Sequence, residues 1–222
     1  HRQDELEKLS KSFTVIPHGV SLSLGSADGI NLSHIDHLNT LCQFVSAPWF
    51  SEHIAFTRYS DVDVGHLVPL PFTEEAIDTV VKNVQIVQQS LARPIALENI
   101  ARLFNVPGGV LNEAFFISEI IRRSKAFLLL DITNLYANAL NEYTDPFKFL
   151  EQLPLDKVIQ IHFCGGVWSG KHYVDSHSTS TPEHVWELIE FVLEKSPVNA
   201  LILERDDDEI PLESLLPVKK TR

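Results

Sequence analysis

The sequence predicts an α/β protein with a mostly parallel sheet that is covered by helices. Two observations support this fold class. Short apolar runs of strand length alternate along the chain with longer stretches of helical periodicity. Most of the short runs are apolar throughout, as in AFLLLD and VIQIHF, which is typical of strands buried on both faces. No internal repeat interrupts the alternation, so one domain over residues 1–222 is the simplest organisation.

Six segments have the length and composition of strands. In chain order they are residues 13–18, 49–56, 94–98, 126–131, 158–163 and 200–204. The breaks rich in Pro and Gly at 105–109 and 164–170 have the size of loops and not of linkers between domains.

The stretches between these strands have apolar residues at helical spacing. The clearest is residues 73–91, where Thr73 suits an N-cap and two glutamates follow it in the first turn. The other expected helices are residues 3–11, 34–45, 111–124 and 182–195. Helices between successive buried strands are typical of βαβ units.

Composition excludes several classes of protein. The chain has 222 residues, 44% of them apolar, which is enough for a sizeable core and excludes a disordered chain. Its 18 basic and 30 acidic residues give a net charge of −12, which argues against nucleic acid as the main partner. No apolar run approaches the roughly 18–20 residues of a membrane span. Two cysteines cannot form a disulfide framework, and no signal-like N-terminus is present, so a cytoplasmic location is expected.

Every expected strand ends in a side chain that can bind a metal: His18, His53, Glu98, Asp131, His162 and Glu204. One polar residue at a strand end is commonplace, because strands stop where polarity begins, but here all six strands share the feature. The carboxyl ends of parallel strands meet at the active site of (β/α) barrels, so these side chains should share one bowl. Burial and repulsion would destabilise three imidazoles and three carboxylates together unless cations were bound.

Three further residues extend this candidate site. Asn134 follows Asp131 by three positions, and Asp175 and His177 lie in the segment YVDSHS, which is expected to be a loop. Mixed imidazole and carboxylate ligands suit iron, zinc or manganese. Nine candidate ligands are too many for one ion, so two or three ions are expected. Asn99 and Cys164, beside these ligands, are candidate substrate-binding residues.

Eight motifs occur in order along the chain: HGVSLSLGS, SEHIAF, HLVPLPFTEEAI, RPIALENI, LLLDITNLYANALN, VIQIHFCG, VDSHS and LILERDD. Together they resemble the multinuclear non-haem iron-dependent oxidase family, which includes the methanobactin-biosynthesis oxidase. The resemblance covers essentially the whole chain. It implies a xylose-isomerase-like (β/α) TIM-type barrel, with six of eight strands visible and the first two β/α units lacking. A more distant resemblance is to the tri-zinc abasic-site endonucleases, which share that barrel.

The resemblance also implies how the ligands divide among metal ions. His18, His53 and Glu98 would hold one metal. Glu98 would bridge to a second, which Asp131, His162 and Glu204 would complete. Asn134, Asp175 and His177 would hold a third. Since the endonucleases have a histidine where this chain has Asn134, and an amide oxygen is a poorer ligand than imidazole, the third metal is expected to be the weakest.

The activity that the resemblance implies is oxidation of cysteine in a ribosomally made precursor peptide, with two to three iron ions as cofactors. Zinc and manganese are the alternative metals. The expected partners are the precursor peptide, a peptide-recognition protein and a second copy of the chain covering the open barrel edge, with neither nucleic acid nor membrane. Two alternatives are a divalent-metal hydrolase or isomerase on the same barrel, and a truncated barrel that only binds metal or a partner.

Overall fold

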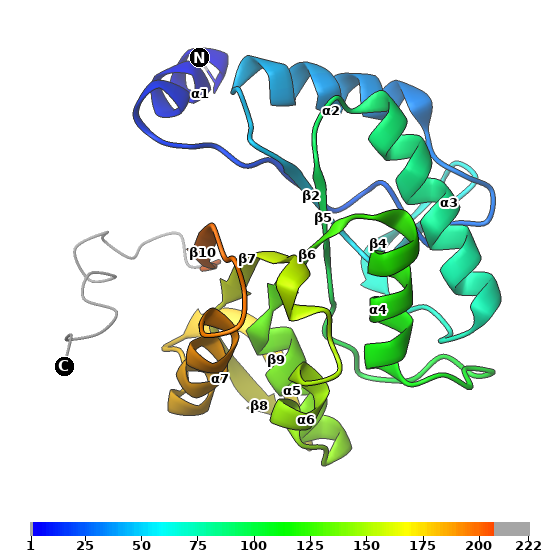
Figure 1. The fold of residues 1–222 in the computed structure, drawn as a ribbon, viewed down its shortest axis with the longest axis vertical. Coiled ribbons are helices and arrows are strands. Elements are labelled where there is room, and N and C mark those ends of the chain that lie inside the picture. The colour runs from blue at the N-terminus through cyan, green and yellow to red at the C-terminus, as the bar shows by residue number, and fades with distance from the viewer. Residues whose placement is uncertain (1, 207–222) are drawn as a thin grey trace.

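The structure is a computed structural model, and it describes residues 2–206. Its main sheet has six parallel strands, and neighbours in the sheet are neighbours in the chain apart from the hairpin strands. In order they are β1 (His18–Gly19), β2 (Phe50–His53), β5 (Ile95–Glu98), β6 (Phe127–Asp131), β7 (Val158–Phe163) and β10 (Ala200–Leu203). The sheet curls like half of a barrel (Figure 1). The α/β fold and five of the six strand positions are therefore confirmed, whereas the segment expected at 13–18 forms a strand only from His18, in the two-residue β1.

The five expected helices are present: α1 (Arg2–Ser12), α2 (Leu32–Phe44), α3 (Glu74–Ser90), α4 (Glu113–Ser124) and α7 (Glu183–Leu193). The Thr73 side chain accepts a hydrogen bond from the Ala76 amide, as an N-cap should. Helices α2, α3 and α4 follow one another along the outside of the sheet (Figure 1). Within the described part of the chain, no helix combines the length and the apolar character needed to cross a membrane.

Three helical segments were not expected: α5 (Ile132–Glu142), α6 (Pro146–Leu150) and the 3-10 turn Leu155–Lys157. Helix α5 begins directly after β6, so no Gly, Pro or loop segment separates the strand from the helix. Asp131 ends the strand and caps the helix, because its side chain accepts a hydrogen bond from the Asn134 amide at 2.6 Å. The aspartate that marks the site therefore also marks the helix start.

Alternation along the strands separates the core from the site. Phe50, Leu97, Leu128 and Ile161 face the helices and join the large buried core. The residues between them face the inside of the curl, where Ala96 and Leu129 pack under the strand ends. The inner face therefore changes from apolar to polar over two residues, as from Ala96 to Glu98.

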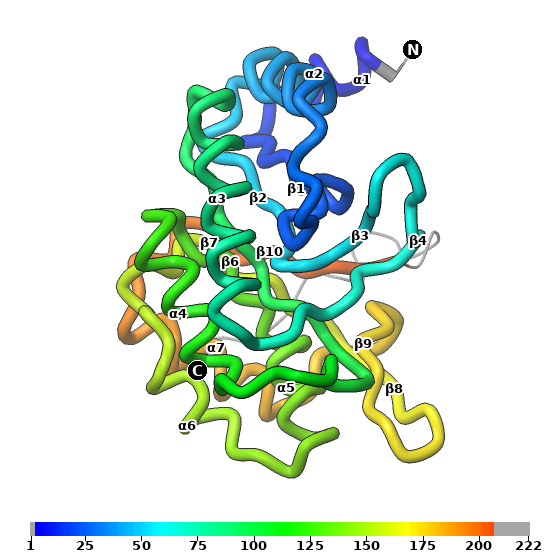
Figure 2. The backbone as a smooth tube through the Cα atoms, turned by 90° about the vertical axis from the view of Figure 1, so that its right-hand side faces the viewer, coloured from blue at the N-terminus to red at the C-terminus, as the bar shows by residue number. Residues whose placement is uncertain are grey.

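Two antiparallel hairpins extend from the strand ends: β3 (Phe56–Tyr59) with β4 (Val62–Val68), and β8 (Gly165–Ser169) with β9 (His172–Thr179). They follow β2 and β7 and project on the same side of the molecule (Figure 2). The expectation of a loop at YVDSHS was wrong, since this segment lies in β9. Glycine allows the close pairing, because a Cβ at Gly166 would lie 2.4 Å from the Val174 carbonyl oxygen.

Replacing Phe116 by Ala should lower the free energy of unfolding by about 3–5 kcal/mol, because its ring is buried against Phe72 and truncation leaves a cavity. Its neighbour Phe115 on the same helix is 45% exposed, so Phe115→Ala is the matched control and should cost less than about 1 kcal/mol. Urea unfolding measures both. Equal losses of unfolding free energy in the two variants would show that α4 does not bury the face that carries Phe116.

Candidate metal centre

Strand register brings four of the sequence candidates together. His53 on β2 lies opposite Glu98 on β5, and Asp131 on β6 lies opposite His162 on β7. All four are buried, each less than 8% exposed. Because the strands are parallel, these positions share the same end of the sheet. Glu204 follows β10 at that end.

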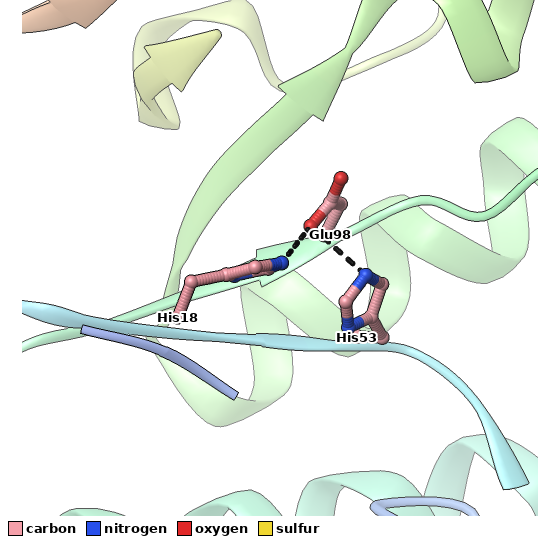
Figure 3. A group of neighbouring side chains, drawn as sticks. All are labelled: His18, His53 and Glu98. Atoms are coloured by element: carbon pink, nitrogen blue, oxygen red, sulfur yellow. Dashed lines mark ion pairs between the residues drawn. The ribbon is translucent and has the colours of Figure 1, made fainter. Parts of the chain in front are cut away.

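Glu98 is the centre of the first group, with His18 and His53 (Figure 3). Its Oε2 atom lies 3.1 Å from His18 Nε2 and 3.3 Å from His53 Nε2. The two imidazoles come from neighbouring strands, with ring centroids 4.6 Å apart. Two imidazole nitrogens and one carboxylate oxygen thus face a common point.

The second group uses the other oxygen of the same carboxylate. Glu98 Oε1 lies 3.5 Å from His162 Nδ1, and that nitrogen lies 2.7 Å from Glu204 Oε1. Ligand atoms of Glu98, Asp131 and His162 all lie within 4.8 Å of one another. Glu98 therefore presents one oxygen to each group.

The third group lies on the hairpin side. His177 Nε2 is 2.8 Å from Asp175 Oδ2 and 3.5 Å from Glu204 Oε2, so Glu204 also presents one oxygen to each of two groups. Alternate residues of a strand share a face, which places Asp175 and His177 together. A register shift in the β8–β9 pairing and a φ of 50° at His177 re-aim this part of the strand. The sulfur of Cys164 joins this group.

Asn99 and Asn134 are buried behind the ligands. The Asn99 side chain donates to the Asp131 carbonyl and accepts from the Asp131 amide, both at 2.9 Å, and so fixes the end of β6. Asn134 Nδ2 donates to the Asn99 carbonyl at 3.1 Å. The substrate-binding role of Asn99 and Cys164 stays a prediction. In the structure Asn99 bonds to the Asp131 backbone, and the Cys164 sulfur bonds to the Asp175 carboxylate.

Three residues that sequence reasoning missed orient the histidine rings. Ser51 Oγ lies 2.9 Å from His18 Nδ1, and the Trp49 indole donates to Gln160 Oε1 at 2.6 Å. The amide nitrogen of Gln160 lies 2.6 Å from His162 Nε2. Outer contacts of this kind fix the orientation of metal-binding imidazoles. The sequence did carry a signal for Gln160. Side chains alternate between the two faces of a strand, and Gln160 is two positions before His162, so both lie on the same face.

Several buried atoms of the centre lack a hydrogen-bond partner, which tests whether cations fit. Glu98 Oε2, Asp131 Oδ2 and Asn134 Oδ1 accept no hydrogen bond of normal geometry, despite their burial. An unsatisfied buried polar group costs about 1–3 kcal/mol, and more when it is charged. Oxygens with free lone pairs beside imidazole nitrogens are what iron, zinc or manganese would satisfy. The residues present fit metal ions.

The electrostatics follow from burial and mutual contact. Burial raises the pKa of the Asp131 carboxyl well above its ordinary value, and the charges of Glu98 and Asp175 add to this rise. For Glu98, burial would also raise the pKa, but the surrounding histidines outweigh it and hold the pKa well below its ordinary value. Burial lowers the pKa of His162, yet the carboxylates of Glu204 and Glu98 raise it to about 10. The cluster therefore holds protons where cations would otherwise sit.

The remaining histidines lie apart from these groups. None of His34, His37, His66, His172 and His184 joins a ligand group within residues 2–206. A cavity of about 690 Å³ lies beside Arg102, and none of the ligand residues lines it. There the Arg102 guanidinium contacts Glu113 at 2.5 Å and Glu142 at 2.7 Å. Asn99, which adjoins Glu98 in the chain, is the one candidate site residue that borders this cavity.

A curled parallel sheet with imidazoles and carboxylates at its strand ends defines the class of (β/α)-barrel metalloenzymes. The chain belongs to the family whose model is described as the RiPP precursor modification enzyme MbnB/TglH/ChrH, which matches residues 1–220. RiPPs are ribosomally made and then modified peptides. The resemblance inferred from the motifs is therefore confirmed at the level of the family.

Relatives in several bacteria have similar sequences. A UPF0276 protein of Caulobacter vibrioides is 36% identical over 211 residues, which is 95% of this chain and 75% of the relative. A UPF0276 protein of Streptomyces avermitilis is 34% identical over 94% of this chain, but the match covers only 44% of that protein. One from Vibrio vulnificus is 32% identical over 97% of this chain and 75% of its own length.

Solved structures confirm the expected xylose-isomerase-like fold. The 3-keto-D-glucoside 4-epimerase of E. coli superposes with a TM-score of 0.59 at 12% identity, covering 96% of this chain and 81% of that one. A D-psicose 3-epimerase of Clostridium cellulolyticum gives 0.57 at 10% identity, covering 99% and 76%. A xylose isomerase domain protein of Planctomyces limnophilus gives 0.55 at 13% identity, covering 96% and 77%. At such identities the likeness concerns the fold alone.

The metal-free protein should lose stability as pH rises from about 6.5 to about 10. His162 has its pKa raised from 6.5 to about 10, and Asp175, followed by Cys164, raises that of His177 to about 12. The folded state therefore keeps protons that the unfolded state releases, so the free energy of unfolding falls with pH.

Urea unfolding across this pH range, with chelator present, measures the effect. Metal-loaded protein is the control and should show a smaller fall, because bound cations take the place of those protons. A metal-free protein whose stability rises over the same range would contradict this account of the cluster.

Proposed function

We propose that the protein is a multinuclear iron-dependent oxidase that modifies cysteine in a ribosomally made precursor peptide. Family membership supports a precursor peptide as the substrate. The observation that carries the proposal is the continuous row of ligand-type atoms, in which Glu98 and Glu204 each present one oxygen to each of two groups. Carboxylates that face two ways in this manner are suited to bridging metal ions.

The chain's residues would hold up to three ions in a row. The first site would use His18, His53 and Glu98 Oε2. The second would use Glu98 Oε1, Asp131, His162 and Glu204 Oε1. The third would use Asp175 and His177, with Asn134 proposed from the family resemblance. This division adds a second bridging carboxylate, Glu204, to the single bridge at Glu98 that the sequence suggested.

Iron, when bound, would supply the oxidation of the peptide thiol by dioxygen, which side chains alone cannot perform. The protein's own residues would position the metal ligands and set the electrostatics around them. Each imidazole has one hydrogen-bond partner on the protein: Ser51 lies 2.9 Å from His18, the Gly19 carbonyl 2.9 Å from His53, and Gln160 2.6 Å from His162. These contacts keep the ligand nitrogens pointing at the centre. Burial of Glu98 and Asp131 excludes water from one side of the site, which strengthens electrostatic interactions there.

The hairpins β3–β4 and β8–β9 support a route for the peptide. Both project from the end of the sheet that carries the ligands, on the same side (Figure 2). A peptide lying between them would bring its cysteine to the strand ends. We propose that a peptide-recognition protein delivers it, and the net charge of −12 suits a basic leader segment or partner. We also propose that a second copy of the chain covers β1 and β10, the two edge strands of the main sheet.

A metal-dependent isomerase or hydrolase is the second candidate, since the solved structures with this fold include sugar epimerases. It would use the same ligands with zinc or manganese and would not consume dioxygen. The two candidates differ in the metal required and in the second substrate.

Protein purified without oxygen or chelator should contain about two to three irons per chain, measured by inductively coupled plasma mass spectrometry, because its nitrogen and oxygen ligands suit that metal. Addition of oxygen and a cysteine-containing peptide to the ferrous protein should then consume dioxygen, followed with an oxygen electrode. Tight retention of zinc or manganese, with no dioxygen uptake by the iron-loaded form, would instead support the isomerase or hydrolase.

Replacing Glu98 by Gln should remove about two ions from each chain, because one of the two oxygens becomes an NH2 group that cannot bind a metal and the other becomes a neutral, poorer ligand. Metal content per chain is the measurement, with far-ultraviolet circular dichroism to verify folding. His172→Gln is the matched control, since His172 is exposed and lies outside the groups. Loss of a single ion in the Glu98 variant would overturn the bridging role.

A further inference from the structure

The third ligand group contains a thiol. Cys164 directly follows β7, its side chain is fully buried, and its sulfur lies 2.8 Å from Asp175 Oδ1. The other carboxylate oxygen, Asp175 Oδ2, lies 2.8 Å from His177 Nε2. Ligand atoms of all three residues lie within 4.8 Å of one another. Sulfur, oxygen and nitrogen thus converge on one small volume.

The surroundings of this sulfur differ from those of an ordinary core cysteine. Cys42, also fully buried, is part of the large apolar core, whereas Cys164 is not. Its backbone is fixed by Thr133, whose hydroxyl accepts from the Cys164 amide at 2.8 Å and donates to the Cys164 carbonyl at 3.1 Å. The sulfur is therefore held against a carboxylate by the protein and is not simply filling an apolar gap.

A second observation points to a missing ligand beside this group. Glu204, directly after β10, adds a ligand-type side chain from a further segment of the chain. Glu204 Oε2, at 3.5 Å from His177 Nε2, also faces the group. Polar atoms from three separate segments of the chain therefore surround a place where a cation would satisfy them.

We propose that Cys164 is a ligand of the third metal ion, together with Asp175 and His177, with Glu204 Oε2 as the fourth ligand. The inference deepens the proposed function, since it rests on the same multinuclear centre and names the ligands of one of its ions. On binding, the S–H bond breaks, the proton passes to the solvent, and the thiolate donates an electron pair to the cation.

A thiolate makes the third site chemically different from the other two, which offer only nitrogen and oxygen. Thiolate ligands favour zinc and iron over manganese and magnesium. The expectation of a weak third site rested on the neutral amide of Asn134. With Cys164 as a ligand, the third site should instead prefer a thiolate-binding metal and resist replacement by manganese.

The test is to titrate cobalt(II) into the metal-free full chain and to follow absorption in the near ultraviolet. A thiolate bound to cobalt(II) gives a charge-transfer band there that imidazole and carboxylate ligands do not give. The band should appear in the natural chain and in Cys42→Ser, the matched control, and be lost in Cys164→Ser. Cys164→Ser should still bind cobalt at the other sites, as its visible absorption bands show.

Several outcomes would overturn the inference: no charge-transfer band at cobalt saturation, a band kept by Cys164→Ser, or a band lost in Cys42→Ser. A second measurement avoids any folding defect of Cys164→Ser. X-ray absorption of zinc-loaded Cys42→Ser should show a sulfur neighbour of zinc at about 2.3 Å, and its absence would also refute the ligand. Neither readout depends on dioxygen or peptide, so the thiolate ligand and the oxidase activity can fail independently.

Discussion

The buried carboxylate of Glu98 is the constraint on which the rest of the centre depends. It lies opposite His53 by strand register, and within 3.5 Å it meets imidazoles from three different strands. Such a charge is tolerated inside a protein only when it is paired or bound to metal. A shift of β5 by one residue would turn it toward the helices and dismantle the first two groups together. The register of the β2–β5 pair is therefore as important to function as the identity of the ligands.

The centre is asymmetric along its length. At one end two imidazoles and a carboxylate come from three successive parallel strands, β1, β2 and β5, paired in regular register. At the other end Asp175 and His177 sit on a hairpin strand with an irregular register, and Cys164 sits where β7 leaves the sheet. Hairpins that project from a sheet open more easily than central strands. Under the proposed function, an ion held there would be the one whose ligands can move as the peptide enters.

Glycine allows the close pairing of β8 with β9 and also limits which positions of the hairpin can supply a side chain. The Gly165–Gly166 pair allows β8 to approach β9 so closely that a Cβ at either position would lie 2.4 Å from a carbonyl oxygen. No side chain can therefore come from these two positions. The side chains of the third group come instead from Cys164, before the pair, from β9 and from Glu204.

Sequence alone determined the fold class, five of the six strands of the main sheet and the residue types at the strand ends, because burial on both faces leaves continuous apolar runs and polarity marks where they stop. It missed α5, since that helix begins at the residue after β6 with no loop between them, and it mistook β9 for a loop, since a half-buried, serine-rich hairpin strand has no apolar pattern. The tertiary structure decided which ligands face one another: Glu204 between two histidines, Gln160 behind His162, and the Cys164 sulfur against Asp175. The contacts of Glu204 and of Cys164 join side chains from separate strands, and register and strand curl, which no local pattern encodes, bring them together; Gln160 shares a strand face with His162.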